Sequence, residues 1–182
     1  MRISRSVILI SLLASMTSSV FGQHDVHAAL LAPAARNMAP AFSLPGETGK
    51  ASQVSDYRGS VVLLNFWATG CGGCVLEIPS FIELERVYKN EGFTAVGVSV
   101  DKSYEDLKND DEAWKKVRAF VVSRKLNYPI LMGNDSIVTA YKVNAYPATF
   151  LIDRHGRIAA AYVGVVNKDN VEANVKTLLS ER

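Results

Sequence analysis

A buried strand that runs directly into a helix constrains the fold of this chain most. Residues 61–67 read VVLLNFW, a nearly continuous β-prone apolar run that predicts a strand buried on both faces of a sheet. Apolar residues then recur at helical spacing over 75–88, and the Asn-Glu-Gly sequence at 90–92 ends the helix. Cys71 and Cys74 lie at the junction. The sequence therefore predicts an α/β fold with a Cys-x-x-Cys motif where a central strand meets a helix.

The other expected elements complete a mixed β-sheet flanked by helices. The patterns predict strands at 42–44, 93–100, 129–131, 148–152 and 158–163, and helices at 114–121, 137–141 and 168–180. Between them, residues 101–112 hold six acidic residues and two lysines. Charge runs of this kind usually lie in solvent, so we expect a solvated insertion, with an added contact surface as the alternative.

The first 22 residues have the features of an export signal peptide. Arg2 and Arg5 form a basic start, residues 7–14 an apolar stretch, and Val20-Phe21-Gly22 a small-residue cleavage context. Cleavage is expected after Gly22, because the apolar run is shorter than the ~20 residues that span a bilayer; an uncleaved anchor is the alternative.

Three segments are therefore predicted: a signal peptide at 1–22, a linker at 23–39 and a folded domain at 40–182. The linker is inferred from its alanine-rich composition, with Pro33 and few large residues. Export would place the chain in the periplasm or another extracytoplasmic compartment, where disulfides persist.

Composition excludes several classes of function. With 48% hydrophobic and 21% charged residues the chain is globular, and a net charge of +2 gives no support for nucleic-acid binding. The two cysteines cannot form a four-cysteine zinc site, and His24, His27 and His155 show no ligand spacing relative to them. We therefore expect no metal and no cofactor.

The position of the two cysteines assigns them different roles. Cys71 is expected by the helix N-terminus, where free amide donors and the helix dipole favour a thiolate, so it is the predicted nucleophile. Cys74 lies about one turn further in and would resolve a mixed disulfide. The alternative is a structural disulfide, but a bridge closing so short a loop stabilises little.

Residues 65–74, NFWATGCGGC, with Glu77-Ile78-Pro79 after them, resemble the thioredoxin-like TlpA/ResA/DsbE family of exported thiol-disulfide oxidoreductases, which is related to the AhpC/TSA redoxins. The resemblance runs from about Pro40 to the C-terminus and includes residues 40–44, 97–101 and 146–153. It implies a thioredoxin-like fold with an inserted helix-strand segment and an N-terminal extension.

The same resemblance implies a function. The chain would reduce disulfides in exported proteins, such as apocytochrome c, and a membrane reductase would recycle its cysteine pair. We expect a monomer that serves cell redox homeostasis and cytochrome c biogenesis.

Further site residues follow from the resemblance. Tyr146-Pro147 would form a cis peptide facing the cysteines and pair with the partner backbone. Glu77 would move protons, since Asn65 stands where thioredoxin has a buried aspartate and cannot titrate. The alternative is that Glu77 is a solvated first-turn glutamate favoured by the helix dipole. Trp67 and Tyr146 are assigned to substrate binding, with burial in the core as the alternative.

Two residues depart from the family pattern, which usually has Trp where Gly70 stands and often Pro where Gly73 stands. Both changes alter the surface that a partner would touch, and the loss of an aromatic removes apolar contact area. Partner choice is therefore expected to differ from that of other family members.

Two other functions remain open. A thiol peroxidase would use one reactive cysteine with a nearby Thr and Arg, and Thr69 precedes Cys71, although the close second cysteine fits disulfide exchange better. A copper carrier would hold a soft ion with the thiolates and His155, in the turn of the predicted hairpin.

Overall fold

The computed structural model describes residues 25–181, and the predicted signal peptide with its cleavage after Gly22 lies outside them. A five-stranded sheet forms the centre of the fold, in the order β5-β4-β3-β6-β7. The strands are β3 (Val61–Trp67), β4 (Phe93–Ser99), β5 (Ile130–Met132), β6 (Ala148–Ile152) and β7 (Ile158–Val163). The pairs β3–β4 and β4–β5 are parallel, whereas β6 is antiparallel to β3 and to β7.

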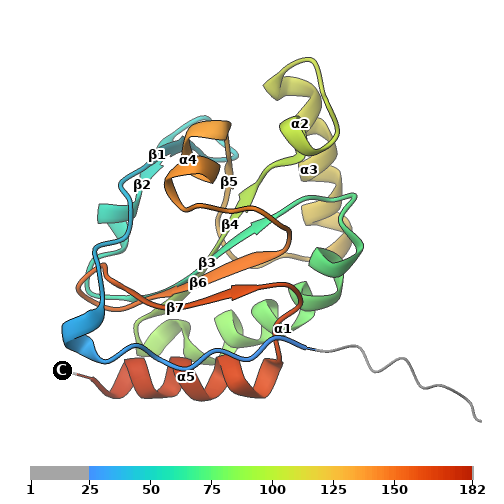
Figure 1. Cartoon of the computed structure of the whole chain (residues 1–182). Coiled ribbons are helices and arrows are strands. Elements are labelled where there is room, and N and C mark those ends of the chain that lie inside the picture. The colour runs from blue at the N-terminus through green and yellow to red at the C-terminus, as the bar shows by residue number, and fades with distance from the viewer. Residues whose placement is uncertain (1–24, 182) are drawn as a thin grey trace, which may run out of the picture.

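Helices cover both faces of this sheet (Figure 1). They are α1 (Gly72–Tyr88), α2 (Asp101–Tyr104), α3 (Asp110–Arg124), α4 (Asp135–Ala140) and α5 (Lys168–Ser180), with short 3₁₀ turns at Pro33–Ala35, Val54–Tyr57 and Lys89–Glu91. Figure 1 shows α1 and α5 beneath the sheet, and α4 with the hairpin of β1 (Ser43–Pro45) and β2 (Ala51–Gln53) above it. The chain thus forms a helix–sheet–helix arrangement.

The central strand β3 is buried along its whole length, as its apolar run predicts. Side chains alternate across a strand, so Asn65 points to the α1 face while Phe66 points to the α4 face. Phe66 accordingly packs against Tyr141, which follows α4, at 5.3 Å between ring centroids. Asn65 is therefore a polar side chain in the middle of the core, on the face of the sheet that α1 covers.

The expected elements and the thioredoxin-like fold with its inserted helix-strand segment are confirmed. The insertion is α3 followed by β5, a crossover that adds a parallel strand beside β4. The solvated insertion at 101–112 is only partly correct. Most of its side chains are exposed, but Asp101 is fully buried, because its carboxylate is held by hydrogen bonds described below.

The segment before the first strand packs against the domain, although its composition predicts a linker. Val26 forms a parallel bridge with Val166, and the Leu31 N–H donates to the Ala159 carbonyl at 2.8 Å. Arg36, 7% exposed, bonds to Asp153 at 3.2 Å. Residues 26–39 thus run along β7 and α5 as part of the fold. Over the described range 25–181, no helix is long and apolar enough to cross a bilayer.

Candidate active site

Cys71 and Cys74 are joined by a disulfide, with sulfurs 2.06 Å apart and Cα atoms 5.3 Å apart. Cys71 is the N-cap of α1, immediately after the loop that leaves β3, and Cys74 lies in the first turn. Cys71 is 4% exposed and Cys74 is fully buried. The predicted division into an outer and a sheltered cysteine therefore agrees with the structure.

The helix N-terminus supplies a donor to the outer sulfur. The Cys74 N–H donates to Cys71 Sγ at 3.2 Å, so the capping group of this helix is a sulfur instead of the usual hydroxyl or carboxylate. In the reduced protein this donor and the dipole of the 17-residue helix would stabilise a Cys71 thiolate. The geometry thus suits Cys71 as a nucleophile.

Glu77 is the buried acid beside the pair, one turn after Cys74 on α1 and 2% exposed. Its Oε1 accepts from Asn65 Nδ2 at 2.7 Å, and its Oε2 accepts from the Val166 N–H at 3.3 Å. Burial raises the pKa of Glu77 to about 8, even though both hydrogen bonds act to lower it. The alternative of a solvated first-turn glutamate is wrong, because the side chain packs against β3 and the segment after β7.

Asn65 links Glu77 to the neighbouring strand. The same Nδ2 donates to Thr149 Oγ1 at 3.0 Å, and Thr149 pairs with Asn65 across β3 and β6. Asn65 Oδ1 is buried without a protein partner in the described part of the chain. Thr149 was not predicted as a site residue, although its place opposite Asn65 follows from the strand register.

A small hollow of about 250 Å³ reaches Glu77 from the side of the N-terminal segment. Its wall includes Glu77 together with Asp25, Leu76, Val165 and Lys168. Glu77 thereby has contact with a solvent-facing space as well as with the core.

Pro147 lies beside the motif, and the predicted cis peptide between Tyr146 and Pro147 is confirmed. A Cβ built on Gly73 would lie 3.3 Å from Pro147 Cδ and 3.2 Å from Val165 Cγ2, so the loop closely covers the first turn of α1. Tyr146 is half-buried, and burial, with a smaller effect from the charge of Asp135, raises the pKa of its phenol.

Asp101 holds the loop that leads to Cys71, a role that the sequence reasoning missed. Its carboxylate accepts from the Thr69 N–H at 3.1 Å, from the Thr69 hydroxyl at 2.5 Å and from the Ser99 hydroxyl at 2.8 Å. The signal was present in the sequence: Asp101 directly follows a buried strand, where a polar residue faces the end of the sheet.

Trp67 is 1% exposed, and its ring lies 5.2 Å from that of Phe120 in α3. Its assignment to substrate binding is therefore corrected: it lies on the same face of β3 as Asn65, beneath the inserted helix, and cannot touch a partner. The core alternative holds.

The geometry does not favour the two other functions. The Thr69 hydroxyl donates to Asp101 and is not free to assist a peroxide. His155 lies in the β6–β7 turn, at the opposite end of β6 from Pro147, and so cannot join the cysteines around an ion. Residues 25–181 contain no group of three or more His, Cys, Asp or Glu side chains placed to hold a metal.

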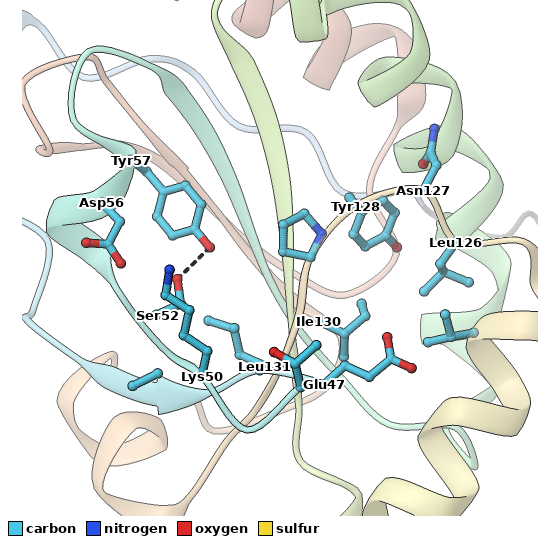
Figure 2. Close-up of a pocket in the computed structure, with 15 residues that line it drawn as sticks. Glu47, Lys50, Ser52, Asp56, Tyr57, Leu126, Asn127, Tyr128, Ile130 and Leu131 are labelled. Atoms are coloured by element: carbon cyan, nitrogen blue, oxygen red, sulfur yellow. Dashed lines mark hydrogen bonds between the residues drawn. The ribbon is translucent and has the colours of Figure 1, made fainter.

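A separate cavity of about 490 Å³ lies between the β1–β2 hairpin and residues 126–131 (Figure 2). Figure 2 shows the Tyr57 hydroxyl pointing to Ser52 on its wall, at 2.9 Å. Neither cysteine lines this cavity, so it is not part of the site described above.

Comparison with known proteins agrees with this geometry. The AhpC/TSA family model matches residues 35–161. Thiol-disulfide oxidoreductase ResA of Geobacillus kaustophilus is 31% identical over 177 residues, which cover 97% of this chain and 95% of the relative. Thioredoxin-like protein YneN of Bacillus subtilis is 35% identical over 134 residues, which cover 74% of each chain.

A solved structure extends the agreement to three dimensions. The thiol:disulfide interchange protein of the thioredoxin family from Chlorobium tepidum superposes with a TM-score of 0.69 at 26% identity, over 82% of this chain and 100% of that one. The family model, the relatives and the solved structure agree on one assignment. The chain belongs to the AhpC/TSA family, among the ResA-like thiol-disulfide oxidoreductases of thioredoxin fold.

Proposed function

We propose that this protein is an exported protein-disulfide reductase that donates electrons from the Cys71/Cys74 dithiol. The observation that carries the direction of attack is the N-cap position of Cys71, whose sulfur receives the Cys74 N–H while Cys74 is fully buried. A partner can approach only the outer sulfur.

The exchange takes place in two displacements. The Cys71 thiolate attacks one sulfur of the partner disulfide, forms a mixed disulfide and releases the partner's other sulfur, which takes up a proton. The Cys74 thiol then loses its proton, and its thiolate attacks Cys71 Sγ. This step forms the Cys71–Cys74 disulfide and releases the second partner sulfur as a thiol after protonation.

Glu77 is the proposed proton acceptor for Cys74. It lies one turn along the same face of α1, and a pKa of about 8 leaves it able to take or give a proton near neutral pH. Pro147 and Tyr146, beside the motif, would contact the partner backbone.

The substrates and location rest on the sequence. The basic and apolar start of the chain favours export to the periplasm or another extracytoplasmic compartment. Disulfide-containing exported proteins, including apocytochrome c, are the proposed partners, and a membrane reductase would return the pair to its dithiol form. We expect a monomer without cofactor.

The test is a trapping experiment with the reduced protein. We expect the wild type to reduce insulin disulfides, and Cys74→Ala to accumulate a mixed disulfide through Cys71, because the resolving thiol is absent. Cys71→Ala is the matched control and should trap nothing. No insulin reduction together with no trapped adduct in Cys74→Ala would overturn the proposal.

A further inference from the structure

Gly70 leaves a space beside Cys71, and two side chains from distant residues occupy it. A Cβ built on Gly70 would lie only 2.6 Å from Glu105 Oε1 and 3.8 Å from Tyr104 Cε1. Both residues belong to the end of α2, in the acidic stretch 101–112, for which the charge pattern predicts a solvated loop with an added contact surface as the alternative. The absence of a side chain at Gly70 is thus compensated by Tyr104 and Glu105.

Tyr104 also connects this space to the loop of Pro147. Its ring lies 5.8 Å from that of Tyr146, at 77° between the planes, and Tyr104 remains 45% exposed. Tyr146 directly precedes Pro147, whose Cδ is 3.3 Å from the Cβ position of Gly73. A partly exposed aromatic pair therefore extends from α2 to the cysteine motif.

Carboxylates surround this aromatic pair. Glu105 forms an ion pair with Lys116 of α3, and Asp106 and Asp135 line one hollow next to α2 together with Lys102. Among the ion pairs of residues 25–181, Lys102 pairs with Asp110, whereas Asp106 and Asp135 pair with no cation. The flank of Cys71 that carries the aromatic rings therefore holds two carboxylates that no ion pair neutralises among the described residues.

We propose that Tyr104, Glu105 and Tyr146 form a cation-binding ledge that selects partners with lysine or arginine next to the target cysteine. Aromatic faces attract cations, and a carboxylate at their edge adds Coulomb attraction. The incoming cation would compete with Lys116 for Glu105. This inference rests on the proposed function and adds to it the chemistry of the partner.

The test uses three disulfide-bonded peptides that differ only in the residue after the target cysteine, which is Lys, Leu or Glu. The second-order rate constant for reduction by the wild-type dithiol is expected to be about tenfold higher for Lys than for Glu at low salt. At 0.5 M NaCl this ratio should fall to about twofold or less, because the charges involved are solvent-exposed and screened.

Two substitutions should move the ratio in opposite directions. Glu105→Gln removes the carboxylate and should lower the Lys/Glu ratio about threefold, while Lys116→Met removes the competing cation and should raise it by a similar factor. Tyr104→Ala should slow the Lys and Leu peptides about threefold, whereas Tyr104→Phe should keep the wild-type rates because the ring face remains.

Glu83→Gln is the matched control, since Glu83 is also an exposed carboxylate in an ion pair, with Arg86 of α1. It lies eleven residues from the start of α1, roughly 17 Å along the helix, and should leave the ratio unchanged. Equal rates for the Lys and Glu peptides would overturn the proposal. A change of the Lys/Glu ratio in the same direction for Glu105→Gln and Lys116→Met would do so too. Failure to reduce any peptide would instead count against the proposed function.

Discussion

At the residue scale, Glu77 is held as a buried acid between a helix and the sheet. The low polarity of its surroundings disfavours the carboxylate, and two donors, Asn65 and the Val166 amide, offset only part of that cost. In this position one side chain can alternate between acid and base near neutral pH. That property suits a residue that must exchange a proton with a neighbouring thiol.

The ionisation of Glu77 should make stability depend on pH. In the unfolded chain the group titrates near 4.5, whereas the folded protein keeps the proton up to about 8. Between these values the native state binds more protons, so the free energy of unfolding should fall as pH rises, by up to about 1.4 kcal/mol per pH unit, and level off above 8. Denaturant titrations of the oxidised protein, whose cysteines do not titrate, measure this slope.

Glu77→Gln should lose that part of the slope, while Glu47→Gln, which removes an exposed carboxylate, should keep it. Parallel stability curves for Glu77→Gln and wild type between pH 5 and 8 would contradict the assignment.

Gly72 and Gly73 offer a matched pair of substitutions in the first turn of α1. A Cβ on Gly72 meets nothing within 4 Å, so Gly72→Ala should raise the free energy of unfolding by ~0.5–1 kcal/mol through helix propensity. A Cβ on Gly73 presses on Val165 and Pro147, so Gly73→Ala should be less stable than Gly72→Ala by about 1 kcal/mol. Equal stability of the two variants would show that the Pro147 loop moves to accommodate the added methyl group at little cost in free energy.

At the scale of elements, the loop from β3 to α1 is fixed by the start of α2. Thr69 and Ser99 lie at the ends of adjacent parallel strands, and Asp101 bonds to both. Buried hydrogen-bond donors that lose an acceptor carry a large penalty. The segment after β4 thus fixes Thr69, two residues before Cys71, and with it the loop that leads to the motif.

Removal of that acceptor should destabilise the whole loop. Asp101→Ala is expected to cost ~2–3 kcal/mol in thermal or denaturant unfolding, because the Thr69 amide and two hydroxyls lose their partner. Asp111→Ala, at an exposed position in the same acidic stretch, is the control and should cost less than about 1 kcal/mol. Similar losses for both variants would mean that Asp101 contributes only through its charge.

The sequence predicts the elements well where a single pattern decides them. The apolar run of β3 predicts its bounds, 61–67. The closing helix expected at 168–180 has the bounds of α5. The sequence also indicates Cys71, Cys74 and, by resemblance, Glu77 and Pro147. It does not predict contacts between distant residues. Phe120 packs against Trp67, and the Glu105 side chain lies beside Gly70, 35 positions before it in the chain.

At the scale of the whole molecule, the N-terminal segment ties the two ends of the chain together. The Arg36 side chain is 1% exposed, and its guanidinium bonds to Asp153 after β6 and to Glu181 after α5. These bonds join three segments whose contact the composition of the chain does not predict. The predicted linker therefore contributes to the stability of the domain.

Loss of this contact should weaken the fold. Arg36→Ala is expected to lower the free energy of unfolding by ~2–4 kcal/mol, because it leaves the buried Asp153 with Arg157 as its only cation among the described residues. Arg86→Ala, which breaks the exposed pair with Glu83, should cost less than about 1 kcal/mol. A loss for Arg36→Ala as small as that of Arg86→Ala would show that residues 26–39 contribute little to the stability of the domain.

In the proposed reaction, the hollow beside Glu77 would let the proton and the electrons leave the molecule on different sides. Electrons would pass through Cys71, which a bound partner would cover, whereas Glu77 lines a hollow together with Asp25 and Lys168. A proton taken up by Glu77 would then leave through this hollow while a partner still covers Cys71.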